Sequence, residues 1–187
     1  MANAFLVGKK TVLRPISVAD APLLTQWNND PETRKYLARR FPLSDLDEKA
    51  WIEKVSIISK TPSDVILIVE SKETHEVIGI MGLHNIDWLD RNAVTGTVLG
   101  TEHQGKGLAT DAKMILLEYA FETLGMHKII SHAFSDNHKS IKYSKRCGYV
   151  VEATLKEEIF CEGKWEDITA LACFYDGWKK AKATMEK

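Results

Sequence analysis

A glycine-punctuated turn in the middle of the chain joins two segments of different periodicity. Residues 94–99 (Val-Thr-Gly-Thr-Val-Leu) have the composition of a β-strand, whereas apolar residues from Leu108 onward recur at helical spacing. The turn between them therefore lies at the N-terminus of a helix. Gly105 and Gly107 let the backbone approach a ligand without a Cβ clash, and the first-turn N–H groups favour an anion. These features predict a phosphate cradle, with Lys106 as a cation inside it.

Two other interpretations of this turn compete with the cradle. The spacing Gly100-x-x-x-x-Gly105-Lys106 is close to a P-loop, but Gly107 stands where the Mg²⁺ site of a P-loop needs a Ser or Thr hydroxyl. This mismatch disfavours a nucleotide triphosphatase. The second alternative is an ordinary glycine-bearing turn between a strand and a helix, and the spacing of further residues weighs against it.

Several motifs resemble those of the GNAT N-acetyltransferase superfamily. Gln104, Gly107 and Ala109 meet the pattern of the family's acyl-CoA loop, which is Gln or Arg, two variable residues, Gly, one variable residue, then Gly or Ala. The later segments Asn137-His138-Lys139-Ser140-Ile141 and Gly148-Tyr149 resemble the family's Asn-x-x-Ser-Ile and Gly-aromatic elements. The N-terminal Leu13-Arg14-Pro15 and residues 27–32 look like the opening of the branch that includes ribosomal-protein N-terminal and spermidine acetyltransferases.

The resemblance implies a fold of the α/β class. We expect a mixed, mostly antiparallel sheet with helices on both faces and a central parallel pair of strands, beginning at Val94 and Lys128, that splay apart to admit the pantetheine arm. Acetyl-CoA is the implied co-substrate, with no metal. The implied acetyl-CoA-binding residues are Val98 or Leu99 through a backbone N–H, Gln104, Gly105, Lys106, Gly107, Ala109, Thr110, Asn137 and Ser140.

The local pattern predicts alternating strands and helices without a repeat or linker, which favours a single domain over residues 1–187. Strands are expected at 10–15, 65–71, 77–85, 94–99, 128–134, 149–160 and 167–175. Helices are expected at 19–29, 32–38, 44–58, 106–124 and 138–147. Ser44 and Asp47 form the S-x-x-[DE] box that should begin the third of these helices.

Composition narrows the choice of partners and location. The net charge is −1 with dispersed Lys and Arg, which argues against a dedicated nucleic-acid or membrane partner. The three cysteines leave one over in any disulfide scheme and lack zinc-type spacing, so reduced, buried thiols and a cytoplasmic location are expected. The oligomeric state stays open, a homodimer included.

Transfer of acetyl from a thioester to an amine requires a proton for the leaving thiolate. Many GNAT enzymes place a Tyr four residues before the Gly of the Gly-aromatic pair, and here that position is Ser144. Tyr143 is one residue away, which is about 100° on a helix, so the spacing predicts that it faces elsewhere and packs. Ser144 is therefore the candidate acid, with an ordinary helix serine as the competing interpretation.

The general base is less defined, because the strand carboxylate of some relatives would fall at Val94. Glu158 aligns by its offset with an acidic position of the polyamine-type enzymes, and His84 follows a strand whose end should face the acceptor. A structural histidine, a solvated strand glutamate and a water-relayed proton are the alternatives.

The acceptor is an amine, with a protein N-terminal α-amine as the favoured choice. A small amine such as a polyamine, amino sugar or aminoglycoside is the alternative within enzymes, and a non-catalytic acyl-CoA-binding regulatory protein is the alternative of another class. Residues 27–58 resemble the segment that walls the acceptor cleft in relatives, and acidic groups there would suit a cationic amine. Trp88 and Trp165 fall in loops, where edge packing competes with stacking on a ligand.

Overall fold

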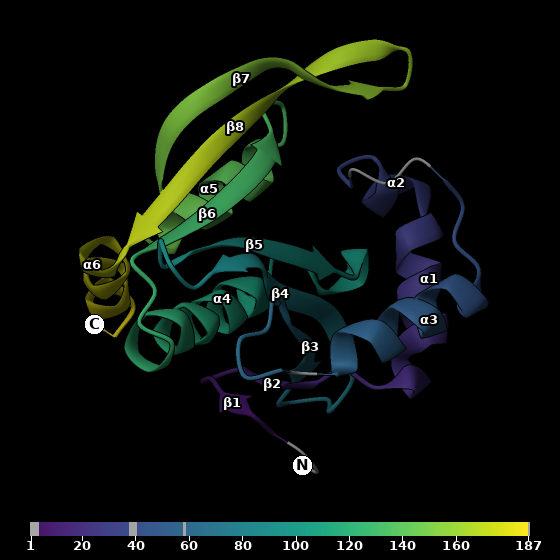
Figure 1. Ribbon diagram of the computed structural model, residues 1–187, viewed down its shortest axis with the longest axis horizontal. Coiled ribbons are helices and arrows are strands. Elements are labelled where there is room, and N and C mark those ends of the chain that lie inside the picture. Colours follow the sequence, from purple (N-terminus) through teal and green to yellow (C-terminus); the bar gives the residue numbers. More distant parts are fainter. Residues whose placement is uncertain (1–3, 38–40, 58, 187) are drawn as a thin grey trace.

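The computed structural model describes residues 4–37, 41–57 and 59–186, and within them eight strands form one sheet (Figure 1). The strand order is β1-β2-β3-β4-β5-β6-β8-β7, and every neighbouring pair is antiparallel except the parallel pair β5–β6. The strands span Leu6–Val7 (β1), Thr11–Pro15 (β2), Val65–Ser71 (β3), Val77–Asp87 (β4), Asn92–Leu99 (β5), Lys128–Phe134 (β6), Val150–Cys161 (β7) and Lys164–Phe174 (β8). This mostly antiparallel mixed sheet confirms the predicted fold class.

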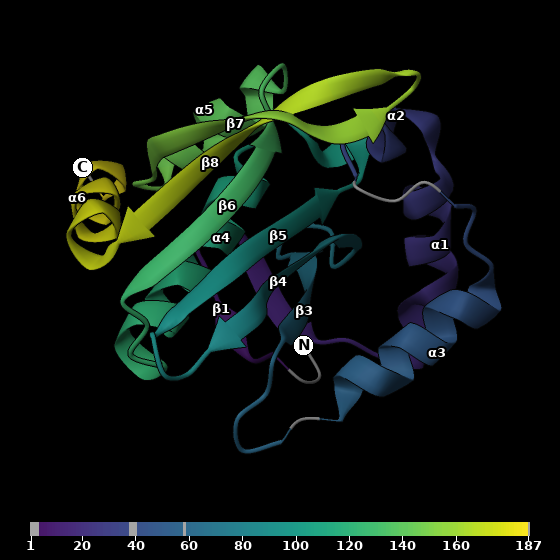
Figure 2. The ribbon, with the colours of Figure 1, turned by 45° about the horizontal axis from the view of Figure 1, so that its top comes forward.

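The parallel pair is joined over only a short stretch. β5 and β6 pair from Asn92 with Lys128 to Val94 with Ile130, although β5 continues to Leu99 and β6 to Phe134. Beyond the last pair the two strands diverge, as Figure 2 shows. The predicted splay is therefore present, and it leaves the edge of β5 after Val94 without a strand partner on this side.

Helices cover both faces of the sheet, as expected. They span Ala21–Asn29 (α1), Pro31–Arg34 (α2), Asp45–Ser56 (α3), Leu108–Glu118 (α4), His138–Arg146 (α5) and Tyr175–Met185 (α6). Leu116 and Leu117 of α4 pack with the inner side chains of β3, β4 and β6 in the main core. Leu24 of α1 and Ile52 of α3 pack on the opposite face, against Ile66. The strands are thus buried on two sides, which explains the near-continuous apolar run of β3.

Local signals determine most element boundaries. The strand predictions at 65–71 and 128–134 match β3 and β6 residue for residue. The Ser44 hydroxyl accepts the Asp47 backbone N–H at 3.2 Å, and the Asp47 carboxylate accepts the Ser44 backbone N–H at 2.9 Å. The predicted capping box is therefore confirmed. Two predicted helix ends, at 38 and 58, lie outside the described residues. The helix expected over 106–124 continues past α4 as a π-helical turn at Tyr119–Thr123.

Two elements escape the sequence pattern. The short β1 was not expected, and the predicted strand over 167–175 ends at Phe174, where α6 begins. Trp178 of α6 is 1% exposed, and its indole Nε1 donates to the Met114 carbonyl of α4 at 3.3 Å. Because α6 has one strong apolar anchor rather than a full stripe, its stability comes from packing on α4 and not from periodicity.

Candidate functional site

The glycine turn between β5 and α4 has the geometry of an anion cradle. Gly105 and Gly107 have φ of 78° and 79°, the left-handed region that favours glycine. Gly107 is the N-cap of α4, so the first N–H groups of an eleven-residue helix open onto the turn. Gln104 Nε2 donates to the Leu99 carbonyl at 3.3 Å and ties the turn to the end of β5. No atom lies within 4 Å of a Cβ built on Gly105, so the space above it is open.

A second lysine reaches this cradle from the N-terminal segment. The Lys10 Nζ donates to the Lys106 carbonyl at 3.3 Å and lies 3.6 Å from a Cβ built on Gly107. Asp111 in the first turn of α4 holds the segment in place, because its carboxylate accepts the backbone N–H groups of Lys9, Lys10 and Thr11 at 3.0, 2.9 and 2.9 Å. No sequence signal joins Lys10 to a turn 96 residues away, so only the tertiary structure reveals this cation.

The edge of β5 that has no strand partner runs from after Val94 to Leu99, just before the cradle. The side chains of its last two residues point to opposite faces of the sheet: Val98 packs toward α1 and α3, and Leu99 enters the main core on the α4 side. Their backbone groups therefore lie in the plane of the sheet, next to the gap between β5 and β6. The Gly100 N–H donates to the Ile78 carbonyl of β4 at 3.0 Å, and Val98 pairs with Ile80 in the same register, so the Val98 N–H faces β4 and the Leu99 N–H faces the gap. Of the two expected donors to the carbonyl, Leu99 fits this placement, and its role stays a prediction. The remaining loop residues Ala109 and Thr110 lie in the first turn of α4.

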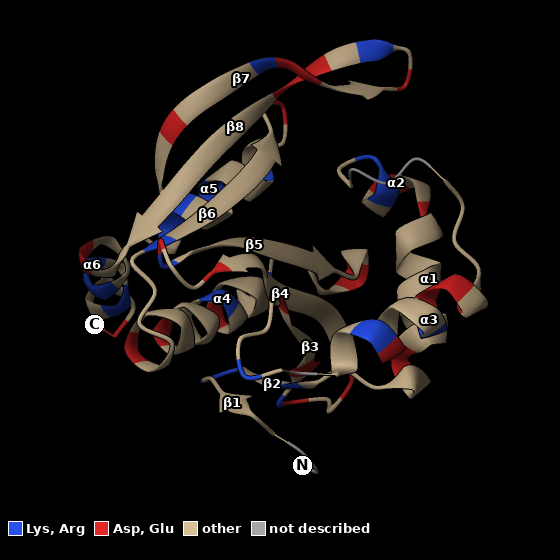
Figure 3. Cartoon of the chain, in the orientation of Figure 1, with Lys and Arg blue, Asp and Glu red and all other residues tan. Residues whose placement is uncertain are grey.

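Helix α5 flanks the gap from the β6 side. Asn137 is its N-cap, and its Oδ1 accepts the Ser140 backbone N–H at 3.0 Å, which confirms the capping role. A contact of Asn137 or Ser140 with a pantetheine group stays a prediction. Basic residues gather on α5, as Figure 3 shows, and Lys145 and Arg146 fill its last turn.

The hydroxyls of Tyr143 and Ser144 on α5 point differently from what the spacing predicts. The Tyr143 hydroxyl lies 3.5 Å from Thr97 Oγ1 on the free part of β5 and donates to the Ala109 carbonyl at 3.3 Å. Tyr143 packs against the main core, as expected, but it does not face elsewhere, because its long ring spans the distance from α5 to β5 and α4. Ser144 is 1% exposed, and its Oγ has no hydrogen-bond partner among the described residues. Burial raises the pKa of the Tyr143 hydroxyl well above its usual value, so this group stays protonated.

The two candidate bases lie in different surroundings. His84 is on the α1 and α3 face of β4, with its Nε2 2.8 Å from a Cβ built on Gly96 of β5, and it is partly exposed. Glu158 follows Glu157, whose φ is 51°, in a bulge where the pairing of β7 with β8 is interrupted between Leu155 and Ile159. Glu158 is exposed there, and no contact among the described residues brings it to His84 or the glycine turn.

A polar cleft of about 420 Å³ lies between α1, α2 and the turn after β5. Its lining is Gln26, Trp27, Asn29, Asp30, Thr33, Thr101 and Glu102. Asp30 caps α2 by accepting the Thr33 N–H at 2.8 Å, which lowers the pKa of its carboxyl and keeps it ionised at neutral pH. Glu102 adds a second carboxylate to the wall. The acidic groups expected in the 27–58 segment are thus represented by Asp30, and Glu102 was missed because it lies within the loop assigned to acetyl-CoA.

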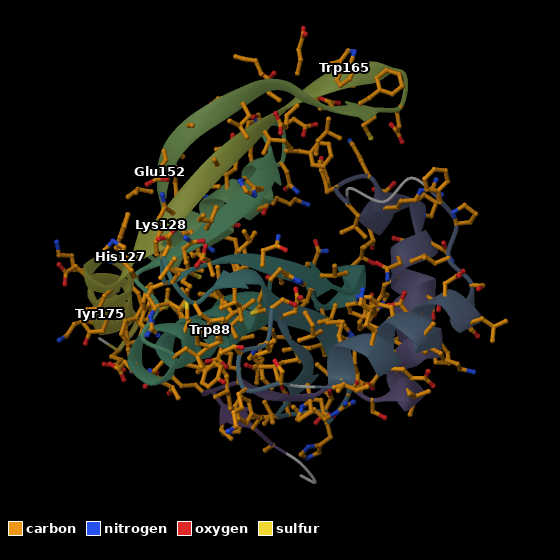
Figure 4. All side chains as sticks on the ribbon, in the orientation of Figure 1. Trp88, His127, Lys128, Glu152, Trp165 and Tyr175 are labelled. Atoms are coloured by element: carbon orange, nitrogen blue, oxygen red, sulfur yellow. The ribbon has the colours of Figure 1, made fainter. Side chains whose placement is uncertain are left out.

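The hairpin β7–β8 closes this region on the other side. Tyr36, just after α2, packs edge-on against Phe134 with ring centroids 5.9 Å apart, in a small cluster with Cys161 and Ile168. Trp165 projects from the distal end of the hairpin (Figure 4), is 59% exposed and contacts Phe160. Trp88 instead donates its indole N–H to the Pro62 carbonyl at 2.9 Å, which supports the packing interpretation for this tryptophan.

Comparison with known proteins agrees with this geometry. The family model described as the acetyltransferase (GNAT) domain matches residues 10–150. An uncharacterized N-acetyltransferase of Bacillus licheniformis, p20, is 30% identical over 164 residues, covering 87% of this chain and 92% of its own. A spermidine N(1)-acetyltransferase of Vibrio cholerae is 28% identical over 162 residues, covering 87% and 91%. YdaF of Bacillus subtilis, named as a ribosomal N-acetyltransferase, is 30% identical over 104 residues, which are 56% of this chain and 57% of its own.

A solved structure shows the same fold. The spermidine N-acetyltransferase of Vibrio cholerae in complex with CoA and spermine superposes with a TM-score of 0.82 at 25% identity, covering 90% of this chain and 98% of that one. The chain belongs to the GNAT family of acetyltransferases, and its activity is the transfer of acetyl from acetyl-CoA to an amine. None of the helices in the described ranges is long and apolar enough to cross a membrane.

Proposed function

We propose that the acceptor is a small amine with more than one positive charge, of the polyamine class. The cleft lined by Asp30 and Glu102 carries this proposal, because two carboxylates at one wall favour a cation. His84 lies over Gly96, and Thr101 at the cleft is five positions further along the chain, which is at most roughly 16 Å of extended backbone. A linear amine can place its reacting end near His84 and a second ammonium at the cleft. The full-length similarity to spermidine acetyltransferases supports the same class.

Neutralising the two carboxylates should weaken binding of such an amine. We expect Asp30→Asn and Glu102→Gln each to raise KM for spermidine about fivefold to tenfold with little change in kcat, because an attraction in the bound state is lost. Asparagine is as good an N-cap as aspartate, so Asp30→Asn preserves α2. The measurement is steady-state CoA release with varied spermidine. Glu32→Gln, an exposed carboxylate in the first turn of α2 that does not line the cleft, is the matched control. Equal KM values in all four proteins would contradict a cationic site here.

A peptide N-terminal α-amine is the second candidate acceptor, favoured by the similarity to YdaF. A panel of polyamines, amino sugars, aminoglycosides and ribosomal-protein N-terminal peptides, with CoA release and mass detection of products, separates the two. Acetylation of spermidine but not of the peptides supports the proposal. Acetylation of the peptides alone would replace it.

The residues of the gap have complementary tasks in direct attack on the thioester. Acetyl-CoA supplies the activated acetyl group, and the open glycine turn and unpaired β5 edge fit its diphosphate and pantetheine portions. The backbone N–H of Leu99, which faces the gap, stabilises negative charge on the carbonyl oxygen. His84 accepts a proton from the amine, and the protonated Tyr143 hydroxyl, rather than Ser144, donates to the leaving thiolate.

The three buried free thiols support the expected cytoplasmic location.

Comparison of Tyr143→Phe with Ser144→Ala tests the proton donor. We expect Tyr143→Phe to lower kcat about 100-fold with an unchanged Kd for acetyl-CoA, since general-acid catalysis of this kind contributes on the order of 10²–10⁴. Ser144→Ala removes a buried, unpartnered hydroxyl and should leave kcat within twofold. Single-turnover acetyl transfer measures both. The reverse order of effects would return the acid role to Ser144.

A further inference from the structure

His84, the proposed base, has a carboxylate partner in Asp64. Its Nδ1 lies 3.2 Å from Oδ1 of Asp64, and the other carboxylate oxygen accepts the Ser63 hydroxyl at 2.6 Å. An ionised aspartate is an acceptor only, so Nδ1 donates the proton in this pair, and in the neutral imidazole Nε2 then keeps its lone pair. The side chains of His84 and Asp64 are 37% and 31% exposed, which leaves the imidazole accessible from the side of α1 and α3.

The free nitrogen points to the place where the two parallel strands separate. A Cβ on Gly96 would lie only 2.8 Å from Nε2, so the imidazole edge fills the space that a side chain on β5 would take. Gly96 is two residues beyond Val94, the last residue of β5 that pairs with β6. Nε2 therefore lies against β5 at the opening of the gap, next to the backbone groups expected to hold the thioester.

The fold fixes Asp64 opposite His84. Val65 at the start of β3 pairs with Leu83 of β4, so in this antiparallel register the preceding residue of β3 faces the following residue of β4. Two bonds from the end of β4 hold the segment before β3: the Ile86 N–H donates to the Ser63 carbonyl at 2.8 Å, and the Trp88 indole (labelled in Figure 4) donates to the Pro62 carbonyl at 2.9 Å. The position of the carboxylate is thus set by the backbone, Ser63 and Trp88.

We propose that Asp64 is a positioning residue for the acetyl transfer, which holds the His84 imidazole in the tautomer and orientation that takes a proton from the acceptor amine. This inference rests on the proposed role of His84. The ammonium of the acceptor loses one proton to Nε2, and the imidazolium is stabilised by Asp64. The neutral nitrogen forms a bond to the acetyl carbonyl carbon, the carbon–sulfur bond breaks, and the electron pair leaves on sulfur. The Tyr143 hydroxyl protonates the thiolate, the second amine proton restores Tyr143, and Nε2 releases its proton to solvent. The products are the acetamide, CoA thiol and one proton.

The strands on either side of this imidazole present no charged side chain next to it among the described residues. On β5 the residues beside it, Val94 and Gly96, carry no titratable group, and on β3 the neighbours Val65 and Ile66 carry none either. Asp87 lies further along β4, with its Oδ1 engaged by the N–H groups of Leu89 and Asp90 at 2.9 and 2.8 Å. In the part of the chain that the structure describes, Asp64 is the charged group in hydrogen-bonding distance, and its removal should act on the imidazole directly.

The first part of the test is kinetic. In Asp64→Asn we expect kcat to fall roughly 10- to 100-fold with KM for acetyl-CoA within twofold, because the imidazole loses the partner that orients it. Gly96→Ala keeps both side chains but displaces the ring, and should also lower kcat. Adding Asp64→Asn to His84→Gln should cost less than twofold more. Asp90→Asn, an exposed turn carboxylate, is the control.

The second part needs no acceptor and separates this inference from the proposed substrate. Nitrogen-15 NMR of the resting protein should show His84 with its proton on Nδ1, and Asp64→Asn should shift that ring toward the Nε2–H tautomer. If spermidine proves not to be a substrate, the kinetic series is run with the amine that the panel identifies. An Nε2–H tautomer in the wild-type protein, or a wild-type kcat in Asp64→Asn, would overturn the positioning role.

Discussion

Gly107→Glu is expected to raise the dissociation constant for acetyl-CoA at least a thousandfold while the protein stays folded. Gly107 has a φ of 79°, where a residue with a Cβ is strained, and it is the N-cap from which α4 presents its N–H groups. A glutamate there also brings a negative charge beside Lys10 and Lys106. This carboxylate would compete with the phosphates of acetyl-CoA for the two lysines and for the N-terminus of α4, and would repel the phosphates. A thousandfold corresponds to about 4 kcal/mol of binding free energy.

Calorimetric titration with acetyl-CoA, together with circular dichroism, measures this effect. Gly125→Glu is the matched control, because Gly125 has a φ of 66° and open space around its Cβ but lies in the turn before β6. It carries the same strain and charge and should bind acetyl-CoA within twofold of wild type. Gly107→Ala separates the contributions, since it adds the strain without the charge and should weaken binding only about tenfold. Equal affinity in Gly107→Glu and Gly125→Glu would remove the glycine turn from the acetyl-CoA site.

Lys113→Met is expected to stabilise the protein by about 2 kcal/mol at pH 7. Lys113 of α4 is 1% exposed, with its ammonium 5.5 and 5.6 Å from the ring centres of Tyr143 and Tyr149. No carboxylate among the described residues forms an ion pair with it. Burial lowers the pKa of Lys113 from 10.5 to about 8, and this difference corresponds to roughly 3 kcal/mol of destabilisation when the group is charged. The contacts with the two rings offset part of that cost.

The sign of the pH dependence follows from the same shift. Below about pH 8 both the folded and the unfolded chain hold the proton, so the full penalty is present. Between pH 8 and 10.5 the unfolded chain keeps the proton that the folded chain has lost, and the wild-type protein becomes more stable as the pH rises. The advantage of Lys113→Met should therefore shrink over this range.

Urea unfolding of both proteins at pH 7 and 9.5 measures this change. Lys182→Met is the control on α6, because the ion pair with Glu118 raises the pKa of Lys182 and its side chain is partly exposed. That variant should be slightly less stable than wild type, by a similar amount at both pH values. A loss of stability in Lys113→Met, or a gain that does not depend on pH, would contradict a cost of the buried charge.

Local patterns were enough for much of the fold and for the cofactor side of the site. The β-branched run of β3, the Ser44 and Asp47 box of α3 and the glycine turn before α4 each depend on neighbours within a few residues. The splay between β5 and β6 came from the family resemblance and not from periodicity. Helix α6 was missed because its main determinant, the Trp178 contact with α4, joins residues 64 apart.

The catalytic side was less accessible for the same reason. Spacing on a helix placed Ser144 where relatives have tyrosine, but the length of the Tyr143 side chain brings its hydroxyl to β5 across 46 residues of sequence. Asp64 is brought to His84 by strand pairing, and Glu102 meets Asp30 only because α2 folds back beside the turn after β5. Such groups carry no signal in the spacing of a single chain.

The amino-acid sequence by itself determined the α/β class and the glycine turn at the start of α4, since these follow from turn chemistry and periodicity within short segments, and its motifs gave the co-substrate through their resemblance to a known family. The tertiary structure alone decided that Lys10 joins the cradle, that Tyr143 rather than Ser144 presents a hydroxyl to β5, and that Asp64 faces His84. The physical reason is that hydrogen bonds and charge interactions act over a few ångströms in space, and only the packing of the sheet and its helices brings residues distant along the chain within that range.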